Sequence, residues 1–324
     1  MDLARFFAFL VRRVCGPGVP LIISCLILFG FLLPAHSREL PAVRAAVLVS
    51  RNIMPYLEAV EGFKAALLKR SDGEVDVFGI EKLGVEERAD LSQSLAAGEF
   101  DLLVGVGPEA GLLVWKGAWK KGLTRLYLMV LNPDKVFGPG EKACGIPLNI
   151  PAQLQVEMIR RGLPSIRRPG LLFDPQLNSD FFSKTSAAGA LSGLTIVPLK
   201  ISSKKDIPSV LKRQWEEIDS LWLIPDRTVI SESIVRFVVK EALIKGIPVI
   251  GYNRFFYETG VALAFVLDYG ELGMQCAEEA LKVLAGETCR NISPLFHVWV
   301  NPLVARKLGL KLPEKYTLPI ELGP

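Results

Sequence analysis

The chain has 324 residues, of which 50% are hydrophobic and 22% are charged, a balance typical of a globular protein long enough for two domains. Its formal net charge is only +4, and the basic residues are interspersed with acidic ones rather than gathered in one block. Because nucleic-acid-binding proteins concentrate positive charge, this distribution argues against that class of function.

Residues 1–37 differ in composition from the rest of the chain and have the order of a secretory signal peptide. Three arginines precede an apolar run at 19–33, and the small residues Ala35 and Ser37 lie just before Arg38. We therefore expect cleavage after Ser37 and a mature protein in the periplasm or another extracytoplasmic compartment. The alternative is a retained membrane anchor, but an apolar run of about 15 residues is shorter than the ~20 that cross a bilayer.

Two weaker processing signals lie inside this leader. Residues 22–25 resemble a lipoprotein box that would make Cys25 a lipidated N-terminus, although the apolar run continues beyond it. The pair Arg12 and Arg13 is compatible with a twin-arginine signal and also with the positive start of an ordinary signal peptide. Both alternatives stay open.

Removal of the leader leaves three cysteines, Cys144, Cys276 and Cys289. Three are too few for a disulfide framework, but one pair can form in an oxidising compartment. Their spacing matches no metal motif, and we expect neither a metal nor a cofactor.

From Ala42 onward, short apolar runs alternate with stretches of helical period, which is the pattern of a parallel sheet covered by helices on both faces. The pattern stops at Gly162 and Pro164 and then starts again, which indicates a domain boundary. In the first half it predicts strands at 43–50, 75–80, 101–106, 125–131 and 144–150, and helices at 56–69, 85–97, 108–121 and 152–161.

The second half repeats this architecture. It predicts strands at 170–174, 194–201, 220–225, 247–251, 262–267 and 295–300, and helices at 181–192, 206–217, 231–245, 269–285 and 302–308. We therefore expect an α/β fold of two doubly wound parallel-sheet domains. Open α/β sheets bind ligands at the carboxyl ends of their strands, so the cleft between the domains is the expected site.

The sequence after the leader matches no catalytic motif that we recognise. His297 is the single histidine after the leader, and no nucleophile motif accompanies it, so we expect an ordinary strand residue there. Residues 105–107 begin like a dinucleotide-binding fingerprint, but Pro108 and Glu109 follow and the third glycine is missing. We assign no catalytic residue and expect that the protein is not an enzyme.

Polar and aromatic residues at the carboxyl ends of the predicted strands are the candidates for ligand binding. Singly, most of them suit helix caps or turns equally well, but together they surround one predicted cleft. Tyr252 and Phe255 belong to an aromatic loop that suits either a flat ligand or packing between domains. The candidates are Ser50, Asn52, Pro108, Glu109, Asn132, Asp174, Asn178, Asp226, Arg227, Tyr252, Asn253 and Phe255.

Asp226 is the preferred candidate within this set. A carboxylate at a strand end can pair with a ligand cation and accept hydrogen bonds, and closure of the cleft strengthens that pairing. We therefore expect Asp226→Ala to abolish ligand binding and to leave the fold intact.

Several segments resemble, in order, the substrate-binding proteins of one group of ABC transporters, which includes tryptophan- and phenylalanine-binding proteins of the periplasmic-binding-protein-like I fold. The resemblance covers nearly all of the chain after the leader. No one motif is decisive, but their order is. The segments are 61–64, 101–107, 163–166, 170–175, 219–229, 246–251, 268–273, 301–305 and 308–310.

The resemblance implies two discontinuous domains joined by a hinge that the chain crosses three times. The first domain would contain 38–150 plus about 268–290, and the second 151–267 plus about 291–324. Hinge closure would capture a small molecule, an amino acid or another small polar or aromatic compound, for delivery by a monomer to an ABC permease at the inner membrane. The alternative is an exported sensor that signals to a membrane partner without transport.

Departures from the family pattern bear on the ligand. Members commonly place Thr-Asp-Asn where this chain has Pro225, Asp226 and Arg227, so Asp226 matches but the hydroxyl is lost. Arg227 suits either a clamp on a ligand carboxylate or a solvent-facing position. Together with Glu109, these changes argue against an ordinary aromatic amino acid as ligand.

Overall fold

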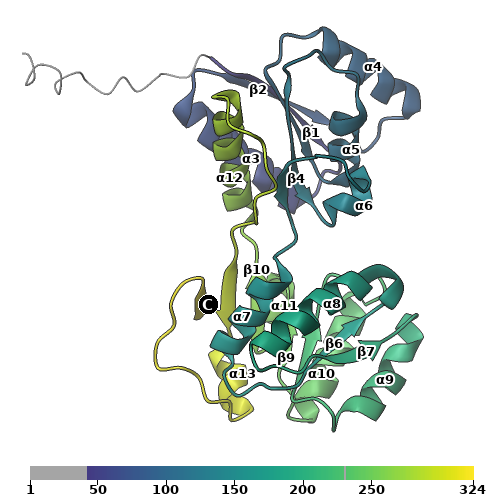
Figure 1. The fold of residues 1–324 in the computed structure, drawn as a ribbon, viewed down its shortest axis with the longest axis vertical. Helices are drawn as coiled ribbons and strands as arrows, with labels where there is room; N and C mark the ends of the chain where they lie inside the picture. Colours follow the sequence, from purple (N-terminus) through teal and green to yellow (C-terminus); the bar gives the residue numbers. More distant parts are fainter. Residues whose placement is uncertain (1–41, 230) are drawn as a thin grey trace, which may run out of the picture. The chain divides into compact units, whose positions relative to one another are not determined.

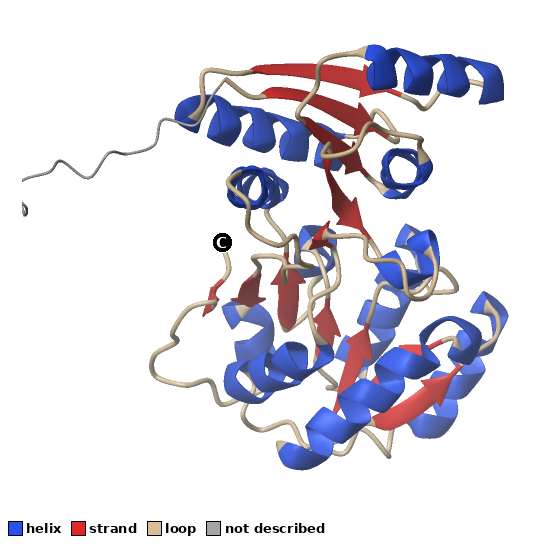
Figure 2. Ribbon diagram, turned by 45° about the horizontal axis from the view of Figure 1, so that its top comes forward, coloured by secondary structure: helices blue, strands red, loops and turns tan. Residues whose placement is uncertain are grey.

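The computed structural model describes residues 42–229 and 231–324, so the leader and its processing signals lie outside the described residues. Two β-sheets form the framework of this part of the chain, and helices flank the strands of both (Figure 1 and Figure 2). Among the described helices, none is long and apolar enough to cross a membrane.

The first sheet has five parallel strands in the order β2-β1-β3-β4-β5. Its strands β1 and β3 are buried almost throughout, as expected where helices cover both faces of a parallel sheet. The strands are β1 Arg44–Val49, β2 Glu74–Gly79, β3 Leu102–Val106, β4 Thr124–Val130 and β5 Gly145–Pro147, and the helices are α3 Met54–Arg70, α4 Val85–Ala97, α5 Pro108–Lys116 and α6 Pro133–Phe137.

The second sheet has seven strands in the order β12-β11-β10-β9-β8-β6-β7, and separate apolar clusters that include Trp222 and Leu221 fill its two faces. The strands are β6 Pro169–Phe173, β7 Val197–Lys200, β8 Ser220–Leu223, β9 Val249–Gly251, β10 Leu263–Val266, β11 His297–Val300 and β12 Ile320–Leu322. The helices are α7 Ala152–Gly162, α8 Pro175–Leu191, the 3-10 turn η1 Lys204–Asp206, α9 Ile207–Gln214, α10 Glu232–Ile244, α11 Arg254–Thr259 and α13 Pro302–Lys307.

The chain passes between the two sheets three times. Helix α12, Tyr269–Leu284, follows β10 of the second sheet but packs against α3, β4 and β5 of the first. Figure 1 shows α12 beside α3. The two helices approach closely because glycine lies at their contact: a Cβ on Gly273 would lie only 2.0 Å from the carbonyl oxygen of Ala59. The fold is therefore the predicted pair of doubly wound α/β domains with a multi-crossing hinge.

The direction of β11 differs from that of its neighbours, because it pairs antiparallel with β10. Val266, at the end of β10, lies opposite His297, at the start of β11. After α12 the chain returns to the second sheet at the same end of the strands where β10 finishes. Strand β11 therefore starts beside the carboxyl end of β10 and runs in the opposite direction. The sequence pattern predicts this strand but not its direction, and it does not predict β12.

A disulfide joins Cys144 and Cys289, whose Cα atoms lie 5.9 Å apart although 145 positions separate them in the sequence. It connects the segment before β5 with the segment after α12. Next to it, Asn291 forms an isolated parallel bridge with Gly145. Cys276 is buried and free. The structure thus selects one pairing from those that the sequence leaves open.

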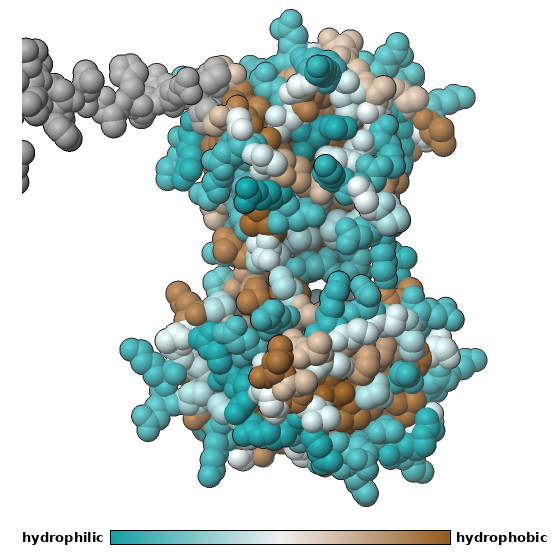
Figure 3. All heavy atoms as spheres, viewed as in Figure 1, coloured by the Kyte–Doolittle hydropathy of each residue, from teal (hydrophilic) through white to brown (hydrophobic). Residues whose placement is uncertain are grey.

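Hydrophilic side chains cover most of the face of the described residues drawn in Figure 3, with hydrophobic residues visible between them in small groups. The exposed large hydrophobic side chains, such as Val85, Leu191, Leu303 and Leu318, come from segments distributed along the described part of the chain. Scattered exposure of this kind is normal for a soluble surface and does not mark a binding face.

Candidate functional site

One cavity, of about 270 Å³, lies where strands of both sheets end. Segments that follow β4 and β5 of the first sheet contribute to its wall, as do segments that follow β8, β9 and β10 of the second. This is the position at which open α/β sheets bind ligands. Its lining consists of Leu131, Asn132, Leu148, Asn149, Ile150, Gln155, Asn178, Phe181, Ile224, Pro225, Tyr252, Asn253, Phe265, Leu267 and Tyr269.

The polar part of this lining carries no formal charge. It consists of carboxamides and phenols, whereas aliphatic and aromatic residues make up the rest; no Asp, Glu, Lys, Arg or His belongs to the described residues that line the cavity. The polar residues are Asn132, Asn149, Gln155, Asn178, Asn253, Tyr252 and Tyr269. An apolar pocket with a few placed polar groups is the usual form of a small-molecule site.

Both phenols are neutral in this setting. Burial raises the pKa of Tyr252 above its ordinary value, and the neighbouring Tyr269 and Asp226 raise it further. Burial is also the main reason why the pKa of Tyr269 is raised, with a smaller contribution from Glu58. The two hydroxyl groups therefore keep their protons at neutral pH and can donate or accept hydrogen bonds.

Asn132 and Asn149 form a pair at the end of the first sheet. The backbone N–H of Asn132 donates to Oδ1 of Asn149 at 2.7 Å, and Nδ2 of Asn149 donates to Oδ1 of Asn132 at 2.7 Å. Asn132 has a left-handed backbone (φ 52°), a conformation that asparagine tolerates better than most residues. The turn that follows β4 and this asparagine pair together fix one side of the cavity.

Asp226 holds the loops at the end of the second sheet. Its side chain is buried (1% exposed), and Oδ2 accepts hydrogen bonds from the backbone N–H of Asp174 and from Nδ2 of Asn178, both at 2.8 Å. Oδ1 accepts a further bond from the backbone N–H of Thr228 at 2.8 Å. Asp226 therefore lies behind Asn178 and outside the cavity lining.

The local conformation of α8 allows this contact. Asp174 caps the helix by accepting a hydrogen bond from the backbone N–H of Gln176, and its other carboxylate oxygen accepts one from Oγ1 of Thr228. Asn178 interrupts the helix with φ −133° and ψ 20°. This interruption brings the amide of Asn178 between Asp226 and the cavity.

Four of the twelve candidate residues line the cavity, namely Asn132, Asn178, Tyr252 and Asn253. The other eight lie outside its lining. In the second sheet, Asp174 lines a separate surface pocket, Arg227 is exposed, and Phe255 packs edge-on against Phe256, with the guanidinium of Arg236 5.4 Å from its ring centre.

The remaining candidates belong to the first sheet. Ser50 is buried, and its Oγ accepts a hydrogen bond from the backbone N–H of Ala110. Asn52 is exposed, and Pro108 occupies the first turn of α5. Glu109 pairs with Arg51 at 3.3 Å. These residues thus shape the carboxyl edge of the first sheet without lining the cavity.

The strand-end rule that selects Asn132 applies equally to Asn149, which follows β5 and is absent from the twelve candidates. Gln155 lies on α7 and Phe181 on α8, and a sequence alone gives no signal that these helix positions face a cavity. Tyr269, at the first position of α12, lies in a segment that the sequence assigns only to the helix.

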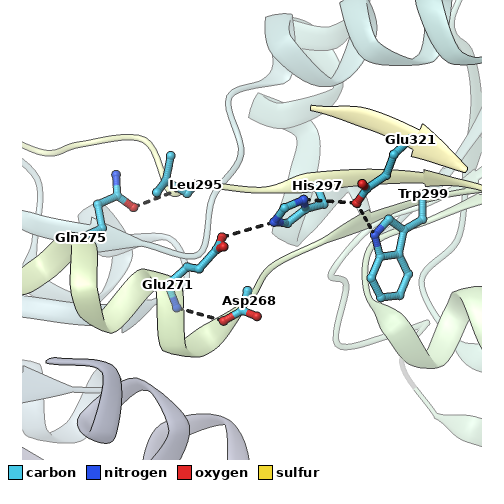
Figure 4. A network of polar contacts seen from close by, with 7 residues as sticks. All are labelled: Asp268, Glu271, Gln275, Leu295, His297, Trp299 and Glu321. Carbon is cyan, nitrogen blue, oxygen red and sulfur yellow. Dashed lines mark hydrogen bonds and ion pairs between the residues drawn. The ribbon is translucent and has the colours of Figure 1, made fainter. Parts of the chain in front are cut away.

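A second polar network lies where the chain crosses between the sheets (Figure 4). His297 of β11 lies between two carboxylates: its Nε2 is 3.2 Å from Oε2 of Glu271 on α12, and its Nδ1 is 3.3 Å from Oε1 of Glu321 on β12. Nε1 of Trp299 donates to the same Glu321 oxygen. Asp268 caps α12 next to this network. His297 therefore connects β11 with α12 and with β12 next to the point where the chain crosses between the sheets.

Comparisons with known proteins agree with this architecture. A family model described as ABC transporter substrate binding protein matches residues 130–318. A domain from Streptococcus pneumonia, solved in complex with L-Trp, is 21% identical, with a TM-score of 0.57 over 84% of this chain and 96% of that one. A search of curated protein sequences gave no match.

Two further solved structures have the same fold. One is the ligand-free, open structure of a substrate binding protein with adhesive properties from Clostridium difficile, which is 16% identical, with a TM-score of 0.71 over 87% of this chain and all of that one. The other is a periplasmic ribose ABC transporter protein from Conexibacter woesei, which is 13% identical, with a TM-score of 0.56 over 84% of this chain and 96% of that one.

At these identities the structural likeness establishes the fold, and the family model, which matches more than half of the sequence, establishes the family. Members of this family are solute-binding proteins that work outside the cytoplasm. The chain belongs to the ABC transporter substrate binding protein family.

Proposed function

We propose that this protein is the extracytoplasmic solute-binding component of an ABC-type importer and that it captures a small molecule in the cavity. The observation that carries the proposal is the lining itself. Asn132 and Asn149 follow strands of the first sheet, whereas Asn178, Tyr252 and Asn253 belong to the second half of the chain. A ligand held by both groups would link the two halves, as hinge capture requires.

Hinge closure is part of this proposal. The three crossing segments are the positions at which backbone rotation would move one sheet relative to the other. The first domain, residues 38–150 plus about 268–290, would rotate against the second domain, residues 151–267 plus about 291–324. Closure would remove water from the cavity and strengthen its hydrogen bonds to the ligand. The closed form would then dock on an ABC permease at the inner membrane.

A thermal-shift screen tests the binding function. The full chain would be expressed with its own leader, purified from the periplasmic fraction and screened against amino acids, nucleobases, nucleosides, sugars and small carboxylates. A ligand at 100 times its dissociation constant adds about 2.7 kcal/mol to the free energy of unfolding, which is a clear shift in melting temperature.

Leu131→Trp, which fills the cavity, should abolish this shift. The matched control is Leu191→Trp, because Leu191 is 89% exposed and lies outside the cavity. A ligand that stabilises both variants equally would bind elsewhere and would contradict the assignment of the site. A ligand that binds in the cavity should also reduce the radius of gyration measured by small-angle X-ray scattering, since closure brings the halves together.

Transport is tested separately, by deleting the gene in the source organism and measuring uptake of the ligand found in the screen. Reduced uptake would support the importer role. Unchanged uptake with a lost response to the ligand would favour the exported sensor instead.

A further inference from the structure

The carboxamides of the cavity have fixed orientations, because each contacts a group that can only donate or only accept a hydrogen bond. Oδ1 of Asn253 accepts a bond from the backbone N–H of Phe256 at 3.1 Å, so its Nδ2 remains for other partners. Oδ1 of Asn149 accepts a hydrogen bond from the backbone N–H of Asn132, and Nδ2 of Asn149 donates one to Oδ1 of Asn132. Among the described residues, the side-chain amide groups Nδ2 of Asn132 and Nδ2 of Asn253 donate no hydrogen bond, so both remain free to donate to a ligand.

Two other carboxamides have the opposite orientation. Nε2 of Gln155 donates to the backbone carbonyl of Ile150 at 2.8 Å, and Nδ2 of Asn178 donates to the carboxylate of Asp226 at 2.8 Å. Within the part of the chain that the structure describes, Oε1 of Gln155 and Oδ1 of Asn178 accept no hydrogen bond. The cavity thus presents donors from two amides, acceptors from two others, and the hydroxyls of Tyr252 and Tyr269, which serve as either.

The charged candidate residues lie outside the lining of the cavity. Asp226 is 1% exposed and accepts three hydrogen bonds, so its carboxylate is not available to a ligand cation. Glu109 lies outside the lining, where its Oε1 pairs with Arg51 and its Oε2 is buried without a hydrogen-bond partner among the described residues, and Arg227 is exposed outside the lining. A charged ligand group in this cavity would lose its hydration without gaining an opposite charge, which disfavours its binding.

The apolar part of the lining suits a flat, hydrophobic ligand. Phe181 and Phe265 contribute aromatic rings, and the other apolar lining residues are aliphatic. The ring of Phe181 is held in an edge-to-face contact with Trp222, with 5.9 Å between the centres. Aromatic ligands gain from such walls through burial and ring–ring contacts.

We infer that the ligand is an uncharged, aromatic small molecule whose edge carries both hydrogen-bond donors and acceptors, as in a nucleobase or an aromatic carboxamide. This inference rests on the proposed function and names the ligand class of the same site. It departs from a free amino acid, whose ammonium and carboxylate groups would both lack an opposite charge in this lining.

Matched pairs of probes that differ in charge test the inference. Isothermal titration calorimetry would compare nicotinamide with nicotinate and indole-3-acetamide with indole-3-acetate, and would compare adenine and uracil with L-tryptophan and L-phenylalanine. We expect the uncharged probes to bind at least tenfold more tightly than the charged ones.

Asn253→Asp is the informative variant, because a carboxylate oxygen can still accept the N–H of Phe256 while the free donor becomes an anionic acceptor. It should weaken binding of the best uncharged probe at least tenfold. The control is Asn301→Asp, which makes the same change at the cap of α13, outside the cavity, and should leave the affinity unchanged.

Charged probes that bind as tightly as their uncharged partners, or a sugar as the only ligand found, would overturn the ligand class and leave the solute-binding function standing. Tight binding of uncharged probes that Asn253→Asp leaves unchanged would also overturn it. If no compound of any class binds, the inference and the proposed function both fail.

Discussion

Nδ2 of Asn178 donates a hydrogen bond to Oδ2 of Asp226 at 2.8 Å, so a carboxylate buried behind the cavity determines how an amide in its wall is oriented. Asp226 thereby acts on the site by orienting the side chain of Asn178 rather than by contacting the ligand. Its burial also changes the expected effect of removing it, because the backbone N–H groups of Asp174 and Thr228 depend on the same carboxylate.

Asp226→Ala should therefore both destabilise the fold and weaken ligand binding. Loss of the carboxylate leaves buried donors without partners, and we expect the free energy of unfolding to fall by about 3 kcal/mol. Urea denaturation measures the stability, and calorimetry with the ligand measures the affinity. Lost affinity with unchanged stability would instead indicate that Asp226 contacts the ligand directly.

The contact between α12 and α3 depends on Gly273. Gly273→Ala would place a methyl group 2.0 Å from the carbonyl oxygen of Ala59, and we expect it to lower the free energy of unfolding by about 2 kcal/mol or more. Gly79→Ala is the control, since no atom lies within 4 Å of the added Cβ. Equal effects of the two substitutions in urea denaturation would show that the helices separate easily at this point.

The Cys144–Cys289 disulfide should contribute to stability because it closes a long loop. Reduction should lower the free energy of unfolding by about 3 kcal/mol. The measurement is urea denaturation with and without dithiothreitol. A variant with both cysteines changed to serine should be destabilised to a similar extent and should not respond to the reductant. A wild-type protein that does not respond either would contradict a stabilising role.

Alkaline pH should unfold the protein through its tyrosines. Burial raises the pKa of all six, for Tyr316 to about 12. In the unfolded chain tyrosines ionise near pH 10. Above that pH the unfolded state therefore binds fewer protons than the folded state, and stability falls as the pH rises.

Absorbance at 295 nm, which follows tyrosinate, should therefore rise together with unfolding measured by circular dichroism. Tyr252→Phe should make the loss of stability above pH 10 less steep. Full ionisation of all tyrosines near pH 10 in the folded protein would contradict the burial described here.

Much of the fold could be predicted because buried parallel strands appear as continuous apolar runs. The run at 101–106, for example, corresponds to β3, Leu102–Val106. In contrast, β12 contains only three residues and gains its stability from β11, a partner that no local pattern identifies. The disulfide pairing could not be predicted for a similar reason, since the two cysteines meet only after the chain has crossed twice between the sheets.

The site could be predicted only in part. The strand-end rule selects Asn132 and Tyr252, and both line the cavity, because parallel strands end at one edge of a sheet. It cannot distinguish a side chain that faces the cavity from one that is buried behind it, and Asp226 is of the second kind. Gln155 could not be predicted, because the face that a helix turns to a cavity depends on tertiary packing.

The packing of α12 on α3 also determines the order in which this protein can fold during synthesis. Phe63 of α3 is fully buried, and α12, which covers α3, is made about two hundred residues later. The first sheet therefore cannot complete its core as it leaves the ribosome. It has to wait until five of the seven strands of the second sheet have been synthesised. A chain that ends before α12 would expose the apolar face of α3 to proteases and to other chains.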